Sequence, residues 1–527
     1  MLHASRVRSA EFEARWASSL PNLTMDEVLA ADVAARPHKV AVIDGRRAVS
    51  YAQLDAMVEQ CARWLEAAGV HRGDAVAWQL PNCLESVVLF FATQRVGAVA
   101  VPIVSIYRER EVAFICAETG AVVLAVPEAD ERFDYGAQAR NVQASVPALR
   151  SVLPVAVGSA GCWAAGGPLP ASRERLAPRD VAVVVYTSGT EARPKGVMHS
   201  AATLLYDTDS IRTLLNLTQD DVFFMPSPLA HITGLQNGVV TPITLGGSVV
   251  LQPRWNPSEA LELVAEHHCT YSVLATPFLQ QMFALPGAAQ AMASFRYVRC
   301  GGADIPDQLM TQAEAAGVKV LRVYGLSELP TLTCTLPTST TSQIRFTDGL
   351  PIGDVEIVIV DDSGIQVPIG QVGHILAAGP EMFLGYVDAS LNAGAFTPEG
   401  LFRTGDLGVF DQNGALQIRG RAKDIIVRGG ENLSALEIEE ALRTDPAVLD
   451  VAVVGVPDPV MGQRARAYLV TSPGAHFDID RLKRLIERHG LAVQKTPEQL
   501  VLVPELPRTA SGKVNKALLR SADSGAG

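Results

Sequence analysis

Short apolar runs alternate with helical periodicity through the first part of the chain, and this alternation limits the possible fold more than any other feature. The segments KVAVIDG (39–45), GDAVAWQLPN (73–82) and AVAVPIV (98–104) each predict a buried strand. Between the first two segments, Ser50 and Gln53 form a capping-box pattern ahead of an amphipathic helix. Strands that alternate with helices usually pair in parallel, so the pattern predicts a largely parallel sheet covered by helices.

The pattern changes further along the chain. A second α/β run extends from Val181 to about Cys334, and from Ile352 onward short alternating strands with tight turns predict a small β-subdomain. A compact module of strands and amphipathic helices follows. We therefore predict an α/β fold with a large N-terminal domain, residues 1–421, that holds two α/β subdomains and the β-subdomain. A small, mobile α+β C-terminal domain, residues 422–527, completes the chain.

Length and composition exclude several classes of protein. A chain of 527 residues is too long for one hydrophobic core. Its net charge of −12 disfavours general nucleic-acid binding. The seven cysteines have no zinc-ligand spacing, which favours buried thiols in a reducing cytoplasm. Neither a signal peptide nor a run long enough to span a membrane is evident, so we expect a cytoplasmic protein.

The stretch TSGTEARPKG (187–196) directly follows the apolar run VAVVVY (181–186). Hydroxyls, a glycine and a lysine behind a strand are typical of a loop that holds phosphate. The stretch is not the common nucleotide-triphosphate loop, because Gly196 follows Lys195 and no Ser or Thr comes next. Taken alone, a stretch of this kind is more often an ordinary solvated turn.

Six further clusters accompany this stretch, and together they point to one family. The set is TSGTEARPKG (187–196), SPLAHITG (227–234), GGADIP (301–306), YGLSE (324–328), TGD (404–406), GRAKD (420–424) and PRTASGK (507–513). In order and spacing the seven resemble the adenylate-forming superfamily, which includes acyl-CoA synthetases, aryl-CoA ligases, peptide-synthetase adenylation domains and firefly luciferase. The resemblance covers nearly the whole chain and is strongest to ligases for short- or medium-chain and alicyclic carboxylic acids.

The resemblance implies a reaction in two steps. A carboxylate attacks the α-phosphorus of ATP and pyrophosphate leaves; the thiol of CoA then attacks the acyl-AMP and AMP leaves. Catalysis of such phosphoryl chemistry is mainly positioning and electrostatic stabilisation. The implied ATP-binding residues are Thr187, Ser188, Gly189, Thr190, Lys195, Gly302, Ala303, Asp304, Tyr324, Gly325, Leu326, Ser327, Asp406 and Arg421.

Two residues are implied in catalysis. Lys513 matches the family lysine that bridges the substrate carboxylate and the α-phosphate, and a flexible ammonium suits contact with two anions. Glu328 matches the carboxylate that holds Mg²⁺, which typically takes one or two carboxylates and phosphate oxygens. Lys423 occupies the hinge position about which the small domain rotates. Without the resemblance, Lys513 and Glu328 are solvated loop residues, and Asp406 and Arg421 are a surface ion pair.

The resemblance also implies which residues lie at the acyl and thiol sites, from their positions in the motifs. His231, Cys300 and Gly301 are expected at the acyl group, although a lone histidine beside apolar residues is also typical of a structural core. Small residues at 301 and 302 favour a compact aliphatic or alicyclic acid. After domain rotation, Gly430, Glu431 and Asn432 are expected beside the acyl-adenylate.

The chain departs from the family pattern at two places, and several functions remain open. Glu191 and Ala192 replace the usual Thr-Gly, and Ala201 replaces a common histidine. The main hypothesis is a CoA ligase. The alternatives are an enzyme that loads a carrier-protein phosphopantetheine and a non-catalytic nucleotide or acyl sensor. The expected ligands are ATP, Mg²⁺ and CoA, with a carboxylic acid as substrate; a carrier protein and a homodimer are open as partners.

Overall fold

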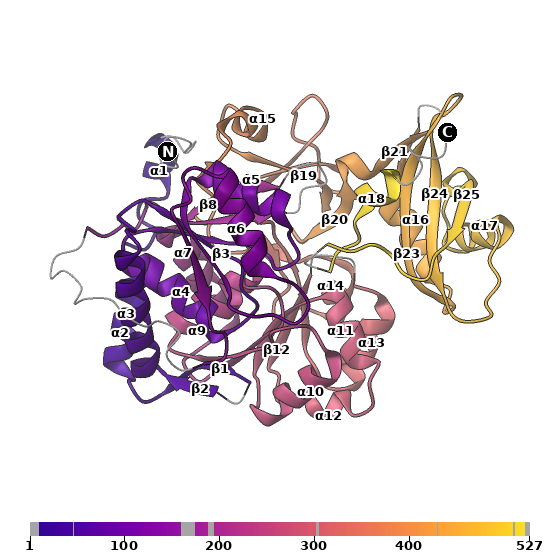
Figure 1. Cartoon of the computed structure of the whole chain (residues 1–527). Helices are drawn as coiled ribbons and strands as arrows, with labels where there is room; N and C mark the ends of the chain where they lie inside the picture. The colour runs from indigo at the N-terminus through magenta and orange to yellow at the C-terminus, as the bar shows by residue number, and fades with distance from the viewer. Residues whose placement is uncertain are drawn as a thin grey trace.

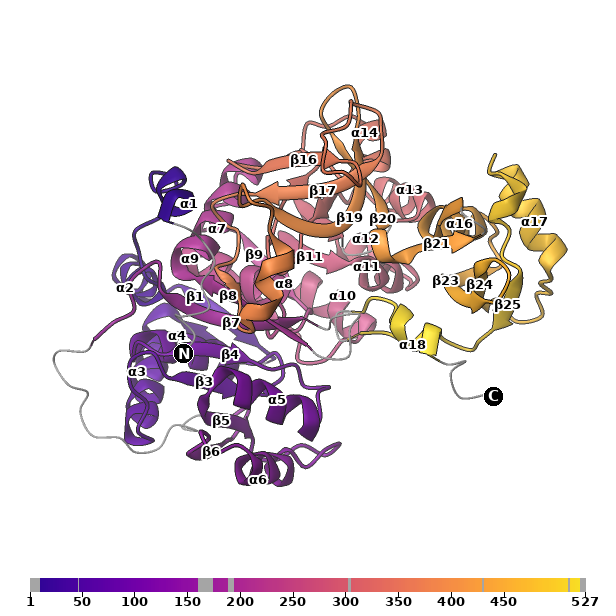
Figure 2. The same cartoon turned by 90° about the horizontal axis from the view of Figure 1, so that it is seen from above.

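The computed structural model describes residues 10–45, 47–159, 174–187, 194–301, 305–428, 431–509 and 512–521. Figure 1 shows a large domain and, to one side of it, a smaller domain formed by the end of the chain. Figure 2 shows the same separation from above, with helix α18 on the side of the small domain that faces the large one.

A nine-stranded sheet forms one half of the large domain. Its spatial order is β15-β14-β13-β12-β11-β9-β10-β1-β2, and the central pairs from β13 to β1 are parallel. Its strands are β1 (Val40–Asp44), β2 (Arg47–Ser50), β9 (Val222–Met225), β10 (Ser248–Leu251), β11 (Tyr271–Ala275), β12 (Tyr297–Gly301), β13 (Val320–Tyr324), β14 (Thr333–Cys334) and β15 (Leu350–Pro351).

A seven-stranded sheet forms the other half, in the order β18-β8-β7-β4-β3-β5-β6. Its strands are β3 (Ala75–Trp78), β4 (Val99–Pro102), β5 (Ala121–Pro127), β6 (Ser151–Val155), β7 (Val181–Thr187), β8 (Lys195–Ser200) and β18 (Gly385–Tyr386). Strands β3 to β7 pair in parallel, whereas β7 and β8 form an antiparallel hairpin. The two α/β subdomains are therefore confirmed.

The helices of the large domain cover these sheets. Ser50 caps α3 by the predicted capping box, and α4 is buried along its whole length because it lies between layers. The first group is α1 (Ala10–Arg15), α2 (Met25–Ala35), α3 (Tyr51–Ala67), α4 (Leu84–Arg95), α5 (Glu109–Thr119) and α6 (Tyr135–Ser145). The second group is α7 (Ala201–Leu215), α8 (Ile232–Leu235), η2 (Gln236–Val240), α9 (Thr241–Thr244), α10 (Pro257–Glu266), α11 (Thr276–Phe283), α12 (Ala288–Ala291), α13 (Asp307–Ala315) and α14 (Thr341–Phe346).

The predicted β-subdomain is a four-stranded antiparallel sheet in the order β16-β17-β19-β20. It contains β16 (Glu356–Val360), β17 (Gly373–Ala378), β19 (Phe402–Phe410) and β20 (Leu416–Arg421), with η3 (Ala389–Leu391) and α15 (Asn392–Ala395) in the connection. The register places Asp406 of β19 opposite Arg421 of β20.

The C-terminal domain has a sheet of its own. Its strands are β21 (Ile425–Arg428), β22 (Glu431–Ser434), β23 (Val448–Asp458), β24 (Gly462–Thr471) and β25 (Gln499–Leu502). Its helices are η4 (Ala422–Asp424), α16 (Ala435–Arg443), α17 (Ile479–Arg488), η5 (Val493–Lys495) and α18 (Lys516–Ser521). Ser434 accepts a hydrogen bond from the Glu437 amide and so caps α16.

The apolar cores divide at the same place as the sheets. Two buried clusters lie wholly within residues 426–519, and the clusters of the large domain draw their members from residues before 421. This supports the predicted division at residues 421 and 422, which remains our proposal. Within the described part of the chain, no helix is long and apolar enough to cross a membrane.

Candidate functional site

The predicted site residues of the large domain gather where parallel strands end. Thr187 ends β7, Gly301 ends β12 and Tyr324 ends β13. In open α/β sheets, ligands bind outside the carboxyl ends of the strands, because loops and helix N-termini meet there. The β-subdomain adds Asp406 and Arg421 to the same region through the Tyr324 side chain.

Asp406 is the centre of a buried polar group. Its Oδ2 accepts a hydrogen bond of 2.7 Å from the Tyr324 hydroxyl, and Arg421 Nε lies 2.9 Å from its Oδ1. The Asp406 amide donates a hydrogen bond to the Thr404 hydroxyl, which fixes the backbone of β19 at this point. Burial raises the pKa of Tyr324 well above its usual value and the Asp406 charge raises it further, whereas the Asp406 carboxylate raises the pKa of Arg421. Tyr324 therefore stays a donor and Arg421 a cation.

Glu328 is joined to the base of the predicted phosphate loop by a tyrosine that the sequence analysis missed. The Tyr386 hydroxyl donates a hydrogen bond of 2.6 Å to Glu328 Oε1. The ammonium of Lys195 lies 5.9 Å from the centroid of the Tyr386 ring, within the range of a cation–π contact. Strand β18 places Tyr386 beside β8, which begins at Lys195. No charge or motif marks Tyr386, so only the fold reveals it.

His231 begins the helical segment α8–η2–α9 as its N-cap residue. Its Nε2 is buried and has no hydrogen-bond partner within the described residues. Burial lowers the pKa of His231 to about 4, and the positive charge of Lys513 lowers it further. The imidazole is therefore neutral near pH 7. The π-helical turn η2 follows directly, and such turns are frequent at functional sites.

Lys513 reaches this group from the C-terminal domain. Its side chain is exposed to solvent, yet desolvation by the surrounding protein lowers its pKa. Arg421 lowers that pKa further, whereas the charges of Asp406 and Glu328 raise it. The same lysine acts on His231. The fold thus brings five predicted site residues, from three regions of the chain, within electrostatic reach of one another.

Two glycines of the site have a structural reason to be glycine. A Cβ on Gly301 would lie 2.2 Å from the Val323 carbonyl oxygen, and one on Gly325 would lie 2.1 Å from the Pro330 oxygen. Close backbone approach therefore requires both. Cys300 is fully buried, with its Sγ 3.7 Å from the Thr276 hydroxyl. Room for acyl carbons beside Gly301 stays a prediction.

A second missed residue, His199, supports the YGLSE loop. The imidazole is fully buried, and its Nε2 lies 2.7 Å from the Ser327 carbonyl oxygen, which can only accept a hydrogen bond. Leu326 closes the same loop through its amide, which donates to the Leu329 carbonyl. Ala201, where a histidine is common in the family, is buried at the start of α7. His199 was visible in the sequence, but nothing there distinguished it.

The hinge prediction falls on η4, directly after β20. Lys423 is exposed there. Its neighbour Asp424 forms an ion pair with Arg520 of α18, and Lys516 bonds Glu439 at 2.7 Å while also facing Asp424. Asp424 is thereby attached to the C-terminal domain, so a pivot would lie at Ala422 and Lys423.

Several predicted site residues fall outside the described residues or away from this group. Those outside are Ser188, Gly189, Thr190, Gly302, Ala303, Asp304 and Gly430, together with the replaced positions Glu191 and Ala192. Glu431 begins β22 on the C-terminal sheet with an exposed side chain. Asn432 pairs with Val427 in that sheet. In this domain arrangement Lys513, rather than this turn, acts on the group around Asp406.

Comparison with known proteins identifies the family. The model of the AMP-binding enzyme family matches residues 29–387, and that of its C-terminal domain matches residues 437–513. The chain belongs to the AMP-binding enzyme family. The resemblance to adenylate-forming enzymes is confirmed, and with it the predicted fold class.

Individual relatives cover almost the entire enzyme. It is 34% identical to the medium-chain fatty-acid–CoA ligase of Escherichia coli K12, over 92% of this chain and 88% of the relative. It is 31% identical to a salicyl-AMP ligase/salicyl-S-ArCP synthetase of Mycobacterium tuberculosis H37Rv, over 94% and 89%. The crystal structure of ATP-bound MatB from Rhodopseudomonas palustris matches with a TM-score of 0.87 and 26% identity, over 95% and 99%.

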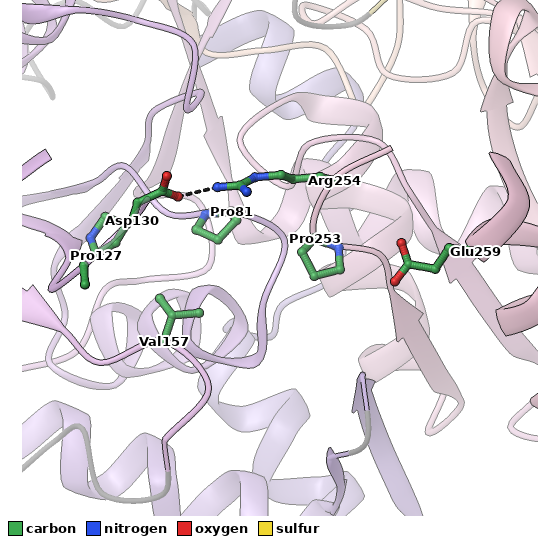
Figure 3. Close-up of a pocket in the computed structure, with 8 residues that line it drawn as sticks. Pro81, Pro127, Asp130, Val157, Pro253, Arg254 and Glu259 are labelled. Carbon is green, nitrogen blue, oxygen red and sulfur yellow. Dashed lines mark hydrogen bonds and ion pairs between the residues drawn. The ribbon is translucent and has the colours of Figure 1, made fainter. Parts of the chain in front are cut away.

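The enzyme also has an open hollow of about 330 Å³ that contains none of the predicted site residues. It lies between the two α/β subdomains, and its walls include Pro81, Val157 and Pro253 (Figure 3). An ion pair between Asp130 and Arg254 links the two sides. The hollow is therefore separate from the group of predicted site residues around Asp406.

The donor groups of the candidate site suit magnesium bound together with a nucleotide rather than a metal held by the protein alone. Within the described residues, no three His, Cys, Asp or Glu side chains gather as a metal site. Glu328 is half-buried, so its carboxylate remains accessible beside the base of the phosphate loop. One such carboxylate with phosphate oxygens and waters is a usual magnesium environment.

Proposed function

We propose that this enzyme is an ATP-dependent acyl-CoA ligase. In the first step a carboxylate oxygen attacks the α-phosphorus of ATP, which forms acyl-AMP and releases pyrophosphate. In the second step the CoA thiol attacks the acyl carbon, which forms the thioester and releases AMP. The observation that carries the proposal is that Lys513, from the C-terminal domain, interacts electrostatically with His231, Arg421, Asp406 and Glu328.

Each nucleotide contact has a candidate residue. The buried Asp406 carboxylate has acceptor capacity beyond Tyr324 and Arg421 for ribose hydroxyls, since a carboxylate offers about four lone-pair sites. Tyr324 would lie against adenine, and Lys195 would face the outer phosphates with Thr187 and the loop that follows it. Glu328 would hold Mg²⁺, whose charge would offset that of the phosphates.

Lys513 is the proposed catalytic residue of the first step. Its ammonium would contact the attacking carboxylate and an α-phosphate oxygen, so that two like-charged reactants are held together. Its pKa is lowered by the surrounding protein and by Arg421, and two bound anions would oppose that shift and favour the charged form. Neutral His231 at the same place adds no repulsive charge.

The second step would use another arrangement of the domains. Rotation about Lys423 would withdraw Lys513 and bring the turn with Gly430, Glu431 and Asn432 to the acyl-AMP. The attachment of Asp424 to α18 supports a pivot at this position, because Asp424 would move with the small domain. Hinges of this kind are a few residues that absorb a backbone change.

The acyl site favours a compact acid. Cys300 and the Nε2 atom of His231 are buried, and the backbones at Gly301 and Gly325 approach their neighbours closely. A methylene that fits should gain roughly 0.8 kcal/mol, and one that clashes should lose more. We therefore expect a sharp optimum in a homologous series of aliphatic or alicyclic acids, with palmitate far from it.

A pyrophosphate-release screen over a panel of carboxylic acids, with and without CoA, tests the function. Acid-dependent release and CoA-dependent AMP formation are expected. Release of pyrophosphate without any thioester to CoA would favour the carrier-protein alternative, which the similarity to a salicyl-S-ArCP synthetase supports; a holo-carrier should then replace CoA. Absence of release with every acid would favour the nucleotide or acyl sensor.

The cysteines and the proposed reaction indicate the compartment and the partners of the enzyme. The six cysteines in the described part of the chain are buried, which suits a reducing cytoplasm. The partners we propose are small molecules: the acid, ATP and CoA. A homodimer is left to direct measurement of the mass in solution.

A further inference from the structure

Hydrogen bonds join the described residues on the two sides of the loop that carries Lys513, 507–509 and 512–515. The Asn515 amide donates to the Pro507 carbonyl, and the Thr509 amide donates to the Lys513 carbonyl, each at 2.7 Å. The Arg508 guanidinium donates to the Gly512 carbonyl at 2.7 Å and also pairs with Asp450 of β23. The backbone of Lys513 is thereby fixed to the C-terminal domain, so the loop moves with that domain.

Gly512 lies close to an aromatic ring of the large domain, that of Phe278. Gly512, the residue before Lys513, has a φ of +81°, and a Cβ built on it would lie 3.8 Å from Cε1 of Phe278. Phe278 belongs to α11, which begins where β11 ends. The backbone of Gly512 therefore lies beside this ring, with space for about one methyl group between them, and Gly512 directly precedes the proposed catalytic Lys513.

The Phe278 ring packs against a second aromatic ring, that of Trp255. It stacks on Trp255 with ring centroids 4.2 Å apart and an angle of 18° between the planes. The Trp255 indole in turn donates a hydrogen bond of 2.6 Å to Gln281 Oε1, one turn further along α11. We call Trp255 and Phe278 the aromatic platform. Stacked rings of this kind give a flat surface with little conformational freedom.

We propose that the aromatic platform is the docking surface for the Lys513 loop during adenylation, so that Phe278 and Trp255 are positioning residues for Lys513. Docking Gly512 on the ring limits where the neighbouring side chain can reach. A displacement of about 1 Å at a reacting group can cost about a hundredfold in rate. The inference rests on the proposed function, and it predicts a selective effect, because the contact would be lost when the domain rotates for the second step.

The test compares Phe278→Leu, which keeps apolar volume in the core but removes the ring, with Phe278→Tyr, which keeps the ring. Phe278→Leu should slow pyrophosphate release on the order of 10-fold, with the KM for ATP little changed. Thioester formation from supplied acyl-AMP should stay within about twofold. Phe278→Tyr should behave like the wild type. Equal loss in both half-reactions would overturn the proposal.

Two further measurements separate docking from a general structural effect. In a Lys513→Ala background, Phe278→Leu should cause almost no further loss, because no ammonium remains to be positioned; full additivity would contradict the proposal. In the ligand-free protein, Phe278→Leu should speed hydrogen exchange in residues 507–515 and leave β23 unchanged. Unchanged exchange in the loop would also overturn it. This exchange readout does not depend on the enzyme adenylating any acid, so failure of the proposed function is seen separately in the wild type.

Discussion

At the scale of single residues, Lys513 determines most of what the site can do. Lys513→Ala should lower the rate of acyl-AMP formation by on the order of 10²–10³, which is typical for the loss of one electrostatic partner of a transition state. Conversion of supplied acyl-AMP to acyl-CoA should survive largely intact, since the lysine would be withdrawn in that step. Separate assays of the two half-reactions check this, and equal losses would count against domain rotation.

The buried imidazole of His231 predicts a dependence of stability on pH. Its pKa is about 4 in the fold, against about 6.5 for an ordinary histidine. Between these values the unfolded chain binds a proton that the folded chain does not, so the free energy of unfolding should fall as the pH falls from 6.5 towards 4. The difference is on the order of 1–3 kcal/mol.

Urea unfolding at pH 7.5 and pH 5 measures this effect. The wild type should lose more stability between the two values than His231→Gln, which has no group that titrates in this range. Identical losses in the two proteins would mean that His231 takes up its proton in the folded state as easily as in the unfolded chain.

Tyr386 should control how well Glu328 is oriented. Tyr386→Phe removes the hydroxyl that donates to Glu328 Oε1, and a supporting residue of this kind typically contributes about 10- to 100-fold in activity or metal affinity. We expect slower pyrophosphate release and a higher Mg²⁺ concentration at half-maximal rate. Tyr206→Phe is a matched control, because its hydroxyl accepts the Asp354 amide instead. The same Mg²⁺ dependence in both variants would remove Tyr386 from this role.

At the scale of elements, the short segment η4 carries the proposed hinge. Lys423→Pro fixes φ at this residue near −65° and disfavours the helical conformation at Ala422, the residue before it. One domain orientation should therefore be favoured. If the adenylating one is retained, the variant should form acyl-AMP but little acyl-CoA. A folded variant that forms both at the wild-type rate would show that the pivot lies elsewhere.

The same scale shows what sequence reasoning could and could not provide. Local signals predicted the strands, the capping box at Ser50 and the antiparallel subdomain, because each depends on neighbours in sequence. Strand partners depend on distant segments: β1 pairs with β10, about two hundred residues later, and not with β3 to β6, which follow it in the sequence. Tyr386 was missed for a related reason, since it approaches Glu328 only through the pairing of β18 with β8.

For the candidate site, the sequence likewise identified individual residues but not the contacts that bring them together. The family pattern named Lys513, Asp406 and Arg421, but the sequence contained no reason for them to meet. The register of β19 against β20 accounts for the pair of Asp406 and Arg421, and the docking of the second domain accounts for Lys513. The aromatic platform has no signal in the sequence at all, because Trp255 and Phe278 belong to no motif and become neighbours only through the packing of α11.

At the scale of the whole molecule, the large and small domains have separate apolar cores and are joined by one short connection. The buried clusters of the C-terminal part draw all their members from residues 426–519, and β25 and α18 close that part on itself. A domain that rotates as one body must stay folded while its contacts with the other domain change. Separate cores therefore meet a physical requirement of the proposed two-step reaction.

This arrangement predicts that residues 422–527, expressed alone, fold cooperatively. A segment of this size with its own sheet and core is within the range of independent domains. A single sigmoidal urea transition and dispersed amide resonances are expected. Residues 1–421 alone should still bind ATP but form acyl-AMP slower by on the order of 10²–10³, as for Lys513→Ala, because the ammonium is missing. An unfolded C-terminal fragment, or full adenylation by residues 1–421, would contradict the division and the role of Lys513 respectively.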